Sequence, residues 1–516
     1  MSRPGYETRY FPRLVPRWPF PGLLALQVLA AIVAWPAQAQ YYAVLKSFGP
    51  GAVNPATGAY TNADGDDPVA EVIISGQTLY GATQGGGTNG SGTLFKVNFD
   101  GGGFAVLHHF LAGTTNASGV FTNGDGQGPR GRLSLNNDTL YGTATFGGIY
   151  GGGTVFRVDT NGNHFTVLKQ FQSSGADGAY PYTGVLLPGN DEVMGETSLD
   201  GSGGGLGTFF QMDTNGNNFV VLHQFSSYPT NGTQPYGTLV QSGNTVYGTT
   251  YSGGTNDTGT LFKVNTNGAN FALLKSFSPL VDNTNSDGAY PRAGLILSGG
   301  VLYGTAYSGG VSSNGVVFRI NTDGSGFTNL HSFSGTTVSY GSGYNSDGAN
   351  PVSRLALVGN NLYGTAKSGS ASEGNIFSVN TDGSNFLSLR AFGATIPDDG
   401  TQPMAGLALS GAMFFGTTEF GGSNYTGTVY AYRWDNVPPV SIARTGTNVI
   451  LSWPTDTRSN ANNFIFTLQA TPQLAPNPSW TNVTNAPTFN PFIGVGWNVL
   501  TNPAAGTMKF FRLSPY

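Results

Sequence analysis

A unit of about 50–60 residues occurs seven times in this chain, and this repetition restricts the possible folds more than any other feature of the sequence. Each copy contains a run of strand-forming residues that holds Tyr-Gly or a close variant. These pairs begin at Tyr80, Tyr141, Met194, Tyr247, Tyr303, Tyr363 and Phe415. A chain built from one repeated unit buries its apolar faces by packing each unit on its neighbours. We therefore expect a repeat architecture.

Each unit holds four short strand-forming runs, A to D in chain order, separated by turn residues such as Gly-Asn and Thr-Asn-Gly. Four antiparallel strands in a unit of this length are typical of a β-propeller blade. Strand A follows a proline in every copy: Pro68, Pro129, Pro181, Pro235, Pro291, Pro351 and Pro403. The sequence predicts an all-β fold with a seven-bladed propeller of four-stranded blades over residues 40–434.

The D runs are displaced along the chain by one strand. The first, Tyr42–Phe48, precedes every proline of this set, and the last copy, which ends at Arg433, is followed by none. We therefore expect the N-terminal strand to complete the blade begun at Pro403 and to close the ring, which leaves no open sheet edge. The alternative is an open β-solenoid, which would need atypical capping repeats.

Residues 1–39 have the pattern of a signal peptide. An arginine-rich start is followed by the apolar run 22–35 and by Ala37-Gln38-Ala39, so we place the cleavage before Gln40. A signal anchor is the alternative. We expect a secreted or cell-surface protein with no membrane span after cleavage, and the absence of Cys means that it must hold together without disulfides.

Charge and composition exclude some partners. The chain carries 22 Lys and Arg against 27 Asp and Glu, a net charge of −5, and its basic residues are scattered, so nucleic acid is not expected as a partner. The carboxylates Asp64, Asp66 and Asp67 lack the twelve-residue loop of an EF-hand calcium site. We assign no metal ligand and no cofactor.

One basic position recurs in strand D of every blade. A row of such cations could bind an anion, but we interpret it as scaffold, in which the stems cover apolar surface and the charged heads stay in water. The histidines among them lie too far apart for one metal site. The residues are Lys46, His108, Lys169, His223, Lys275, His331 and Arg390.

The repeat also resembles a known family. Segments such as LYGTAYSGG (302–310) and GTLFKVNTNGANF (259–271) are similar to the GloVer tandem repeat of exported bacterial choice-of-anchor proteins. The resemblance covers roughly residues 41–433 and is weakest in the third copy, which has Met194 and Glu196. It implies export and an attached C-terminal anchoring or sorting segment. It implies no defined activity, so it transfers no catalytic residue.

The C-terminal region departs from the repeat. Residues 435–439 read as a short linker, and residues 440–516 contain alternating strand patterns that predict a small fibronectin-III-like β-sandwich. The segments LSWP (451–454), FTLQAT (466–471) and FFRL (510–513) resemble C-terminal modules of exported proteins of the Verrucomicrobia type. Trp453, Trp480 and Trp497 could stack on carbohydrate, but buried tryptophan is the usual case in a sandwich.

A ligand is expected where loops of varied length share one face of the propeller. There, the residue after each proline varies between blades, and the B-to-C loops add aromatic rings. The predicted partner is a glycan or another extracellular polymer, bound by tyrosine stacking and arginine hydrogen bonds to a monomeric protein. The predicted ligand-binding residues are Arg130, Phe146, Tyr182, Tyr236, Tyr251, Arg292, Tyr307 and Phe420.

Two other functions stay open. The protein could be purely structural, with no small ligand. It could also be a polysaccharide hydrolase or lyase that uses Glu196 and Glu419, which depart from the repeat. These glutamates belong to well-separated blades, farther apart than glycoside chemistry requires, so we name no catalytic residue.

Overall fold

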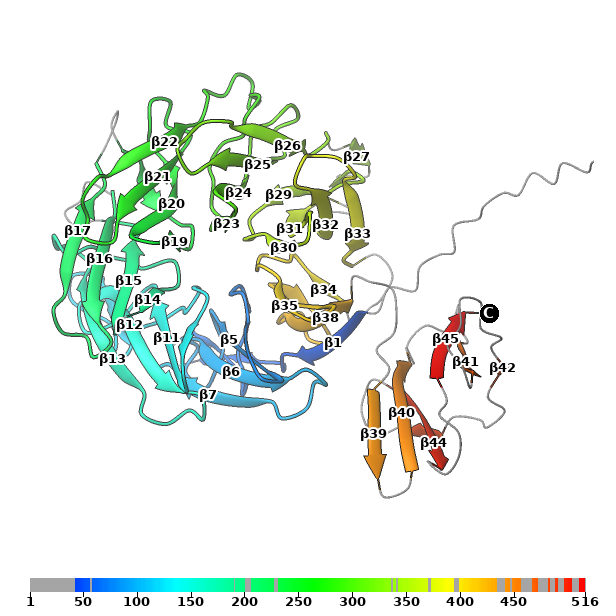
Figure 1. The fold of residues 1–516 in the computed structure, drawn as a ribbon. Coiled ribbons are helices and arrows are strands. Elements are labelled where there is room, and N and C mark those ends of the chain that lie inside the picture. The colour runs from blue at the N-terminus through cyan, green and yellow to red at the C-terminus, as the bar shows by residue number, and fades with distance from the viewer. Residues whose placement is uncertain are drawn as a thin grey trace, which may run out of the picture. The chain divides into compact units, whose positions relative to one another are not determined.

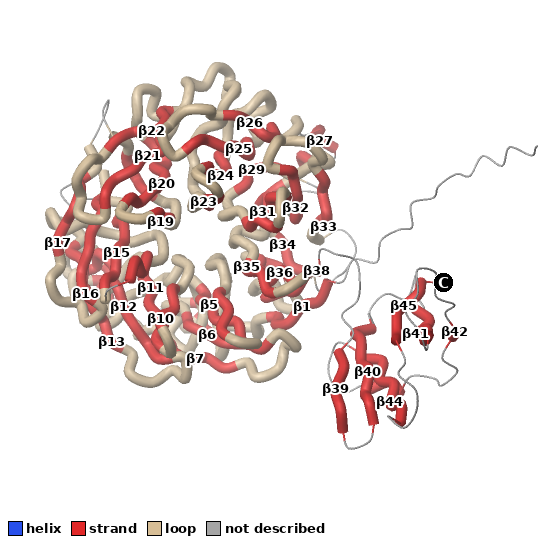
Figure 2. Tube along the Cα trace, viewed as in Figure 1, coloured by secondary structure: helices blue, strands red, loops and turns tan. Residues whose placement is uncertain are grey.

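The computed structural model describes residues 42–55, 58–189, 191–199, 206–226, 231–335, 337–339, 342–369, 373–393 and 399–433, together with the backbone of seven strands between 441 and 515. Figure 2 shows strands and loops in this part of the chain and no helix. Accordingly, the described residues include no helix that could cross a membrane. The expected signal peptide, residues 1–39, and the linker, residues 435–439, lie outside the described residues.

Seven antiparallel sheets, five of four strands and two of five strands, surround a central axis, which is the arrangement of a seven-bladed β-propeller (Figure 1). Blade 1 consists of β4 (Ile73–Ser75), β5 (Thr78–Thr83), β6 (Thr93–Asn98) and β7 (Ala105–His109). Blade 2 consists of β10 (Ser134–Asn136), β11 (Thr139–Ala144), β12 (Gly151–Asp159) and β13 (Thr166–Gln172). Blade 3 consists of β14 (Leu186–Gly189), β15 (Glu192–Thr197), β16 (Thr208–Asp213) and β17 (Val220–Gln224).

The remaining blades follow the same order. Blade 4 consists of β19 (Val240–Ser242), β20 (Thr245–Ser252), β21 (Thr260–Asn265) and β22 (Ala272–Ser276). Blade 5 consists of β23 (Ile296–Ser298), β24 (Val301–Ala306), β25 (Val316–Asn321) and β26 (Thr328–Ser332). Blade 6 consists of β30 (Ala356–Val358), β31 (Asn361–Ser368), β32 (Asn375–Asn380) and β33 (Leu387–Ala391). Blade 7 consists of β35 (Ala408–Ser410), β36 (Met413–Thr418), β38 (Thr428–Arg433) and β1 (Tyr42–Ser47).

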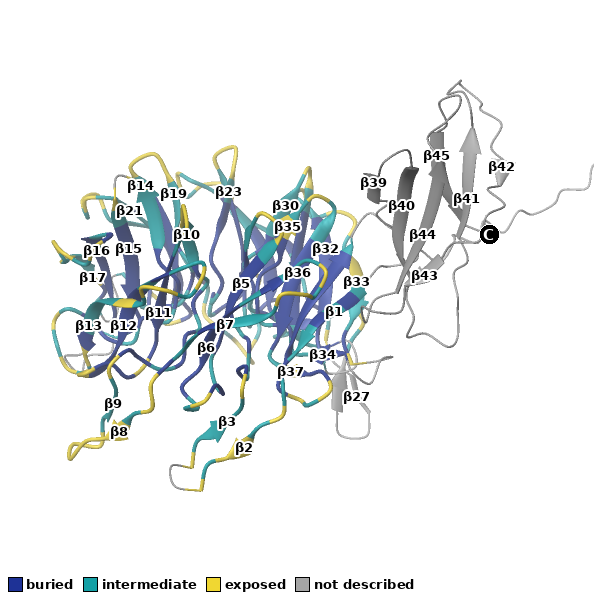
Figure 3. Ribbon diagram, turned by 90° about the horizontal axis from the view of Figure 1, so that it is seen from below, coloured by how far each residue is buried: buried dark blue, intermediate teal, exposed yellow. Residues whose placement is uncertain are grey.

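Short additional strands lie in the connections between these elements. β18 (Thr233–Pro235) adds a fifth strand to the sheet of blade 4, and β29 (Ala349–Pro351) adds one to the sheet of blade 6. β34 (Gly400–Thr401) pairs with β37 (Phe420–Gly421). Three D-to-A connections form hairpins: β2 (Ala52–Val53) with β3 (Tyr60–Thr61), β8 (Thr114–Thr115) with β9 (Phe121–Thr122), and β27 (Thr337–Ser339) with β28 (Ser342–Tyr344). Figure 3 shows the hairpins β2–β3 and β8–β9 extending from the same face of the propeller.

The Tyr-Gly repeat has a packing reason. The glycine lies in strand B, opposite a buried aromatic residue of strand C, as Gly81 lies opposite Phe95. A Cβ on Gly81 would lie 2.5 Å from Cζ of Phe95, so only glycine leaves room for the ring. The seven opposing aromatic residues are all 0% exposed: Phe95, Phe156, Phe210, Phe262, Phe318, Phe377 and Tyr430. The repeated pair therefore marks close packing inside each blade.

The recurring basic side chain of strand D is engaged within the fold, so its head does not stay in water as the sequence indicated. Lys169, for example, has Nζ 2.6 Å from Oδ2 of Asp177 and 4.0 Å from the ring centroid of Phe219 in the next blade. The expectation was wrong because the carboxylate of the following turn folds back over the strand. The seven rim pairs are Lys46–Asp64, His108–Asp125, Lys169–Asp177, His223–Asn231, Lys275–Asp287, His331–Asp347 and Arg390–Asp399.

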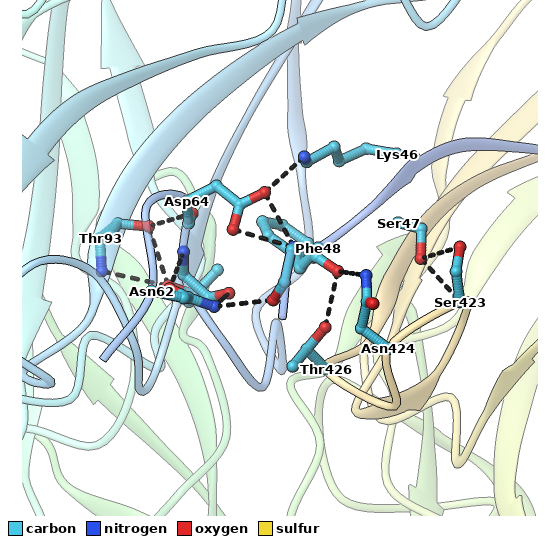
Figure 4. A network of polar contacts seen from close by, with 12 residues as sticks. Lys46, Ser47, Phe48, Asn62, Asp64, Thr93, Ser423, Asn424 and Thr426 are labelled. Carbon is cyan, nitrogen blue, oxygen red and sulfur yellow. Dashed lines mark hydrogen bonds and ion pairs between the residues drawn. The ribbon is translucent and has the colours of Figure 1, made fainter. Parts of the chain in front are cut away.

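Strand β1 pairs antiparallel with β38, so the first and last strands of the propeller share one sheet. Tyr42 lies opposite Tyr432, and the register shifts between Val44 and Lys46, as it does in the outer strands of other blades. Side chains of blade 7 continue this seam (Figure 4): Nδ2 of Asn424 and Oγ1 of Thr426 each donate to the Phe48 carbonyl oxygen at 2.8 Å.

Beyond residue 440 the backbone forms two further antiparallel sheets. In the first sheet the strand order is β39 (Ser441–Thr445), β40 (Asn448–Thr455), β44 (Gly496–Pro503) and β43 (Thr488–Asn490). In the second sheet it is β42 (Thr481–Asn482), β41 (Phe466–Thr471) and β45 (Phe510–Pro515). The side chains of this region, including those of Trp453, Trp480 and Trp497, lie outside the described part of the chain.

Candidate functional site

One cavity of about 190 Å³ lies at the central channel of the propeller, and all seven residues that follow the repeated prolines line it. These residues are Val69, Arg130, Tyr182, Tyr236, Arg292, Val352 and Met404. We call this cavity the channel mouth. At this repeat position every blade thus contributes one side chain to a single cavity. Because the residue type at this position differs between blades, the chemical character of the cavity wall differs from one side to another.

The backbone around each proline explains why this position faces the channel. The residue before the proline has a positive φ in all seven blades, for example 57° at Tyr180 and 58° at Tyr290. Its N–H donates to the B-to-C connection of the preceding blade, as Tyr290 N does to Thr258 O at 2.8 Å, or to the start of strand C, as Tyr180 N does to Gly152 O at 2.7 Å. A left-handed residue is costly outside glycine, so these inter-blade contacts fix the turn and the residue that follows it.

Strand A begins later than the sequence indicated. It was expected directly after the proline, but β4 begins at Ile73, five residues beyond Pro68. Of the intervening residues, Val69 and Glu71 line the channel mouth, whereas Val72 packs in a core cluster. Neighbouring blades also lie close together in this segment. A Cβ on Gly184, for example, would lie 1.9 Å from the carbonyl oxygen of Arg132.

Tyrosine rings form a continuous arc along blades 3 to 5 of the mouth. The ring centroids of Tyr182 and Tyr236 are 4.6 Å apart, and those of Tyr236 and Tyr251 are 5.5 Å apart. Tyr251 in turn stacks on Tyr290 at 5.0 Å and 29°. Such rings combine an apolar face with a polar hydroxyl, which suits both stacking and hydrogen bonding.

Arginines stand at either end of the Tyr182–Tyr236 pair. Arg130 Nη1 donates to the Tyr182 hydroxyl at 2.8 Å. The Arg292 guanidinium carbon lies 4.8 Å from the ring centroid of Tyr251 and 5.1 Å from that of Tyr307. Within the described residues neither arginine has a carboxylate partner, and the Nε of each is buried without a hydrogen bond.

A second layer of charge lies deeper in the channel. The Glu71 carboxylate, 7% exposed, accepts from Arg132 Nε at 3.0 Å and from Arg354 Nη2 at 3.0 Å. Burial alone would raise the pKa of Glu71, but the two guanidinium groups outweigh it and lower the pKa. The three residues also line a second cavity of about 370 Å³, whose other lining residues are aliphatic. They therefore connect blades 1, 2 and 6 across the channel.

The opposite part of the mouth, formed by blades 6, 7 and 1, is aliphatic and acidic. Glu419 lines the cavity and lies 3.3 Å from Lys367 Nζ. Nearby, burial followed by the carboxylates of Asp66 and Glu419 raises the pKa of Asp67 to about 7, while Arg130 acts in the opposite direction. A titrating carboxyl group thus stands beside one of the mouth arginines.

The structure brings together most of the residues predicted from sequence, though not all. Arg130, Tyr182, Tyr236 and Arg292 line the cavity, and Tyr251 and Tyr307 pack around Arg292. Four of the predicted aromatic residues are not among its lining residues: Tyr251, Tyr307, Phe146 and Phe420. Phe146 is 40% exposed and packs on Tyr180 at 5.6 Å, and Phe420 is 37% exposed in β37.

Sequence reasoning also missed residues that belong to the site. Glu71, Arg132 and Arg354 occupy the third position after their prolines, and this shared spacing was the available signal. Tyr290, which extends the aromatic arc, was detectable only as the residue before Pro291. Its left-handed backbone could not be read from residue type, because the other members of that position range from Asp67 to Gly128.

The carboxylate pair considered for catalysis does not share this cavity. Glu419 lines the mouth, whereas Glu196 lies in β15, is 2% exposed and is not among the lining residues. Neither carboxylate oxygen of Glu196 has a hydrogen-bond partner in the described chain, and burial raises its pKa well above the usual range. In the described residues no group of three or more His, Asp or Glu side chains is arranged to hold a metal ion.

Comparison with solved structures finds likeness at low identity. The chain is similar to a chain of a nidogen/laminin complex (14% identity, 60% of this chain and 91% of that one, TM-score 0.35). It is also similar to an oligogalacturonate lyase in complex with manganese (11%, 76% and 96%, TM-score 0.43). A third is a puromycin-hydrolysing peptidase of Mycobacterium tuberculosis (11%, 82% and 64%, TM-score 0.44). These values carry no argument about activity.

A search of the curated proteins finds no match. A family model described as the Gloeobacter/Verrucomicrobia repeat, by contrast, matches residues 51–204, 111–283, 174–346 and 278–451. The matches overlap and together cover residues 51–451, which contain all seven Tyr-Gly motifs or their variants. The chain therefore belongs to the family of Gloeobacter/Verrucomicrobia repeat proteins.

Proposed function

We propose that this is an exported, non-catalytic binding protein that takes a glycan or another extracellular polymer at the channel mouth. One observation carries the proposal: the seven variable positions after the repeated prolines converge on a single cavity, where Tyr182 and Tyr236 lie 4.6 Å apart between Arg130 and Arg292. Adjacent aromatic rings flanked by hydrogen-bond donors are suited to stacking and orienting a sugar ring.

The size of the mouth limits what enters it. Its volume of about 190 Å³ is smaller than the roughly 300–1,000 Å³ of pockets that enclose a drug-sized ligand. A single unit of a polymer, or its end, therefore fits the proposal better than an enclosed chain. The rest of the polymer would lie across the surrounding loops.

The face around the mouth supports contact with something larger than a monosaccharide. Most of the exposed large apolar side chains in the described residues belong to D-to-A or B-to-C connections, which share this face. They are Val53, Leu111, Phe146, Ile149, Tyr150, Val281, Val311, Phe420 and Tyr425. Exposed apolar groups gathered on one face are typical of interaction surfaces.

The test is retention of the full chain on a glycan array and on insoluble polysaccharides. Tyr182→Ala and Tyr236→Ala should each weaken binding at least tenfold, because each removes one ring of the stacking pair. Leu387→Ala is the control, since Leu387 is 57% exposed in the outer strand β33 and belongs neither to the cavity nor to the connections of this face. Equal retention of all four proteins, or loss in the control alone, would move the site away from the mouth. If neither the parent nor any variant is retained on any glycan, the result would favour a purely structural protein with no small ligand.

We also propose export and C-terminal attachment. The family assignment and the sequence of residues 1–39 support a cleaved signal peptide, and the two C-terminal sheets support a fibronectin-III-like β-sandwich that anchors or sorts the chain. N-terminal sequencing of the mature protein should begin at Gln40. An intact Met1 in the cell interior would contradict export.

We further propose that β1 closes the ring and takes the role that disulfides play in other exported proteins. Three contacts support this. The guanidinium carbon of Arg390 in blade 6 lies 3.5 Å from the ring centroid of Tyr42. The other blades have phenylalanine at the position of Tyr42. Lys46 pairs with Asp64 of blade 1. Phe48, 0% exposed, packs with Phe95 and Phe415 in one core cluster.

Removal of β1 tests the closure. A chain beginning at Gly49 should lose cooperative unfolding and melt at a lower temperature than a chain beginning at Gln40, because blade 7 would keep three strands and an open edge. Circular dichroism melting of the two proteins measures the difference. Superimposable melting curves would show that β1 is not needed to close the propeller.

A further inference from the structure

We infer that the ligand of the channel mouth is an acidic glycan, whose carboxylate or sulfate group is bound by Arg130 and Arg292 while its sugar ring stacks on Tyr182 and Tyr236. This inference rests on the glycan-binding function proposed above and specifies its chemical class. It follows from the charge of the cavity, from the partners of its arginines and from their position beside the tyrosine pair.

The cavity is positive although the protein is not. Its lining contains four arginines and two glutamates, an excess of two positive charges, whereas the whole chain carries −5. Positive charge is therefore gathered at this one concave site. A cavity of one sign attracts and concentrates ligands of the opposite sign.

The acidic side chains of the cavity are already engaged. Glu71 is shared by Arg132 and Arg354, which leaves that layer with one positive charge in excess. Glu419 pairs with Lys367. Neither glutamate is bonded to Arg130 or Arg292, and in the described part of the chain no carboxylate forms an ion pair with either arginine. The Asp67 carboxyl group, whose pKa is about 7, interacts with Arg130 without forming an ion pair.

Arg292 has the most open coordination of the set. Among the described residues it makes no ion pair or hydrogen bond, and its neighbours are the rings of Tyr236, Tyr251 and Tyr307. Arg130 makes one hydrogen bond, to the Tyr182 hydroxyl. A guanidinium group has five N–H donors in a planar fork that matches carboxylate and sulfate oxygens. Most of that capacity is free at both residues.

The tyrosine rings favour an acidic sugar over a free inorganic anion as the ligand of the mouth. Arg130 and Arg292 come from blades 2 and 5, and the two rings between them, from blades 3 and 4, offer an apolar surface that a small anion cannot use. A sugar acid satisfies both features, because its ring stacks while its charged group reaches a guanidinium.

Two matched pairs of probes test the inference by calorimetry on the full chain. Polygalacturonate is compared with its carboxyl-reduced form, and dextran sulfate with dextran, so that the two pairs distinguish carboxylate from sulfate. We expect at least one acidic member to bind ten times more tightly than its neutral match. Neutral members that bind as tightly as the acidic ones would overturn the inference and leave the glycan-binding proposal standing. If none of the four probes binds, the inference of an acidic ligand is overturned. The glycan array described under the proposed function then tests the broader glycan-binding proposal.

Substitutions locate the effect. Arg130→Gln and Arg292→Gln should each lower the affinity for the acidic probe about tenfold and leave the affinity for the neutral probe unchanged. Arg292→Lys should retain part of the affinity for the acidic probe. Arg157→Gln is the charge-matched control, because Arg157 contacts Thr214 and Asn215 and does not line the mouth. A loss in Arg157→Gln equal to that in Arg292→Gln would show that overall charge, not the mouth, attracts the polymer. Unchanged melting temperatures establish that the variants are folded.

Discussion

The cations of the outer rim and the arginines of the channel mouth occupy repeated positions in the same propeller, yet their surroundings differ. At the rim, each basic side chain has a carboxylate or amide partner and an aromatic ring, as Arg390 has Asp399 and Tyr42. At the mouth, Arg130 and Arg292 have tyrosine rings and no carboxylate in the described chain. The rim position is basic in every blade, whereas the mouth position ranges from Val69 to Arg292.

This difference separates scaffold from site. A buried cation that is paired within the fold contributes to one stable arrangement, and its removal leaves the partner without compensation. A cation left without a counter-charge in a cavity keeps its hydrogen-bonding capacity for a ligand. Repetition with full pairing therefore indicates structure, and variation without pairing supports the proposal that the mouth binds a ligand.

The largest expected effect comes from breaking a rim pair. The Asp399 side chain is 0% exposed and lies 2.6 Å from Arg390 Nη2. Asp399→Ala should lower the free energy of unfolding by about 3–5 kcal/mol, because it leaves a buried guanidinium unpaired. Urea unfolding measures it, with Arg292→Gln as the contrasting variant, expected to cost about 1 kcal/mol or less. Similar losses in both variants would remove the distinction between rim and mouth.

A smaller effect is expected where the rim pair lacks a carboxylate. Asn231 Nδ2 lies 3.1 Å from His223 Nε2, and burial lowers the pKa of His223 below 6.5. His223 therefore favours folding above pH 6.5, and this contribution is lost as the pH falls. Asn231→Asp would raise the pKa of His223 and reverse the sign, so the variant should gain about 1 kcal/mol at low pH and little above neutrality.

Urea unfolding near pH 5.5 and pH 8 checks this reversal. The Asn231 side chain also accepts from Ser226 N at 2.7 Å, and an aspartate keeps that acceptor, so the substitution changes charge without removing the turn contact. A gain of equal size at both pH values would mean that His223 titration is not involved.

The smallest effect concerns the pH response of the mouth. Asp67 has a pKa of about 7 and is surrounded by Asp66, Glu419 and Arg130. Its raised pKa favours folding at acidic pH, and this contribution is lost as the pH rises through 7. Ionised Asp67 also adds negative charge beside Arg130, so an acidic ligand should bind a few-fold more weakly at pH 8 than at pH 6.

Asp67→Asn should remove most of this pH dependence. Calorimetric titration of the acidic probe at the two pH values measures it, and Asp138→Asn, at an exposed position outside the cavity, is the control. A pH dependence that persists in Asp67→Asn would assign the response to another group.

Much of the fold could be predicted because its determinants are local and repeated. Tyr-Gly, the prolines and the turn residues each act within a few residues, so their recurrence revealed seven four-stranded blades. The same repetition brought Arg130, Tyr182, Tyr236 and Arg292 to one cavity, because equivalent positions in a propeller face the axis together. The late start of strand A could not be predicted, since residue types do not show how closely neighbouring blades approach each other, as at Gly184.

By itself, the sequence determined the number of blades, the order of strands and the positions that could vary, since these depend on periodicity and on side-chain size. Only the tertiary structure decided which charges are satisfied. Lys169 and Asp177 look like unrelated surface residues until the turn folds over the strand. Glu71, Arg132 and Arg354 meet across a channel from three blades, over sequence separations of 61 and 283 residues. Pairing depends on distances in space, which periodicity does not encode.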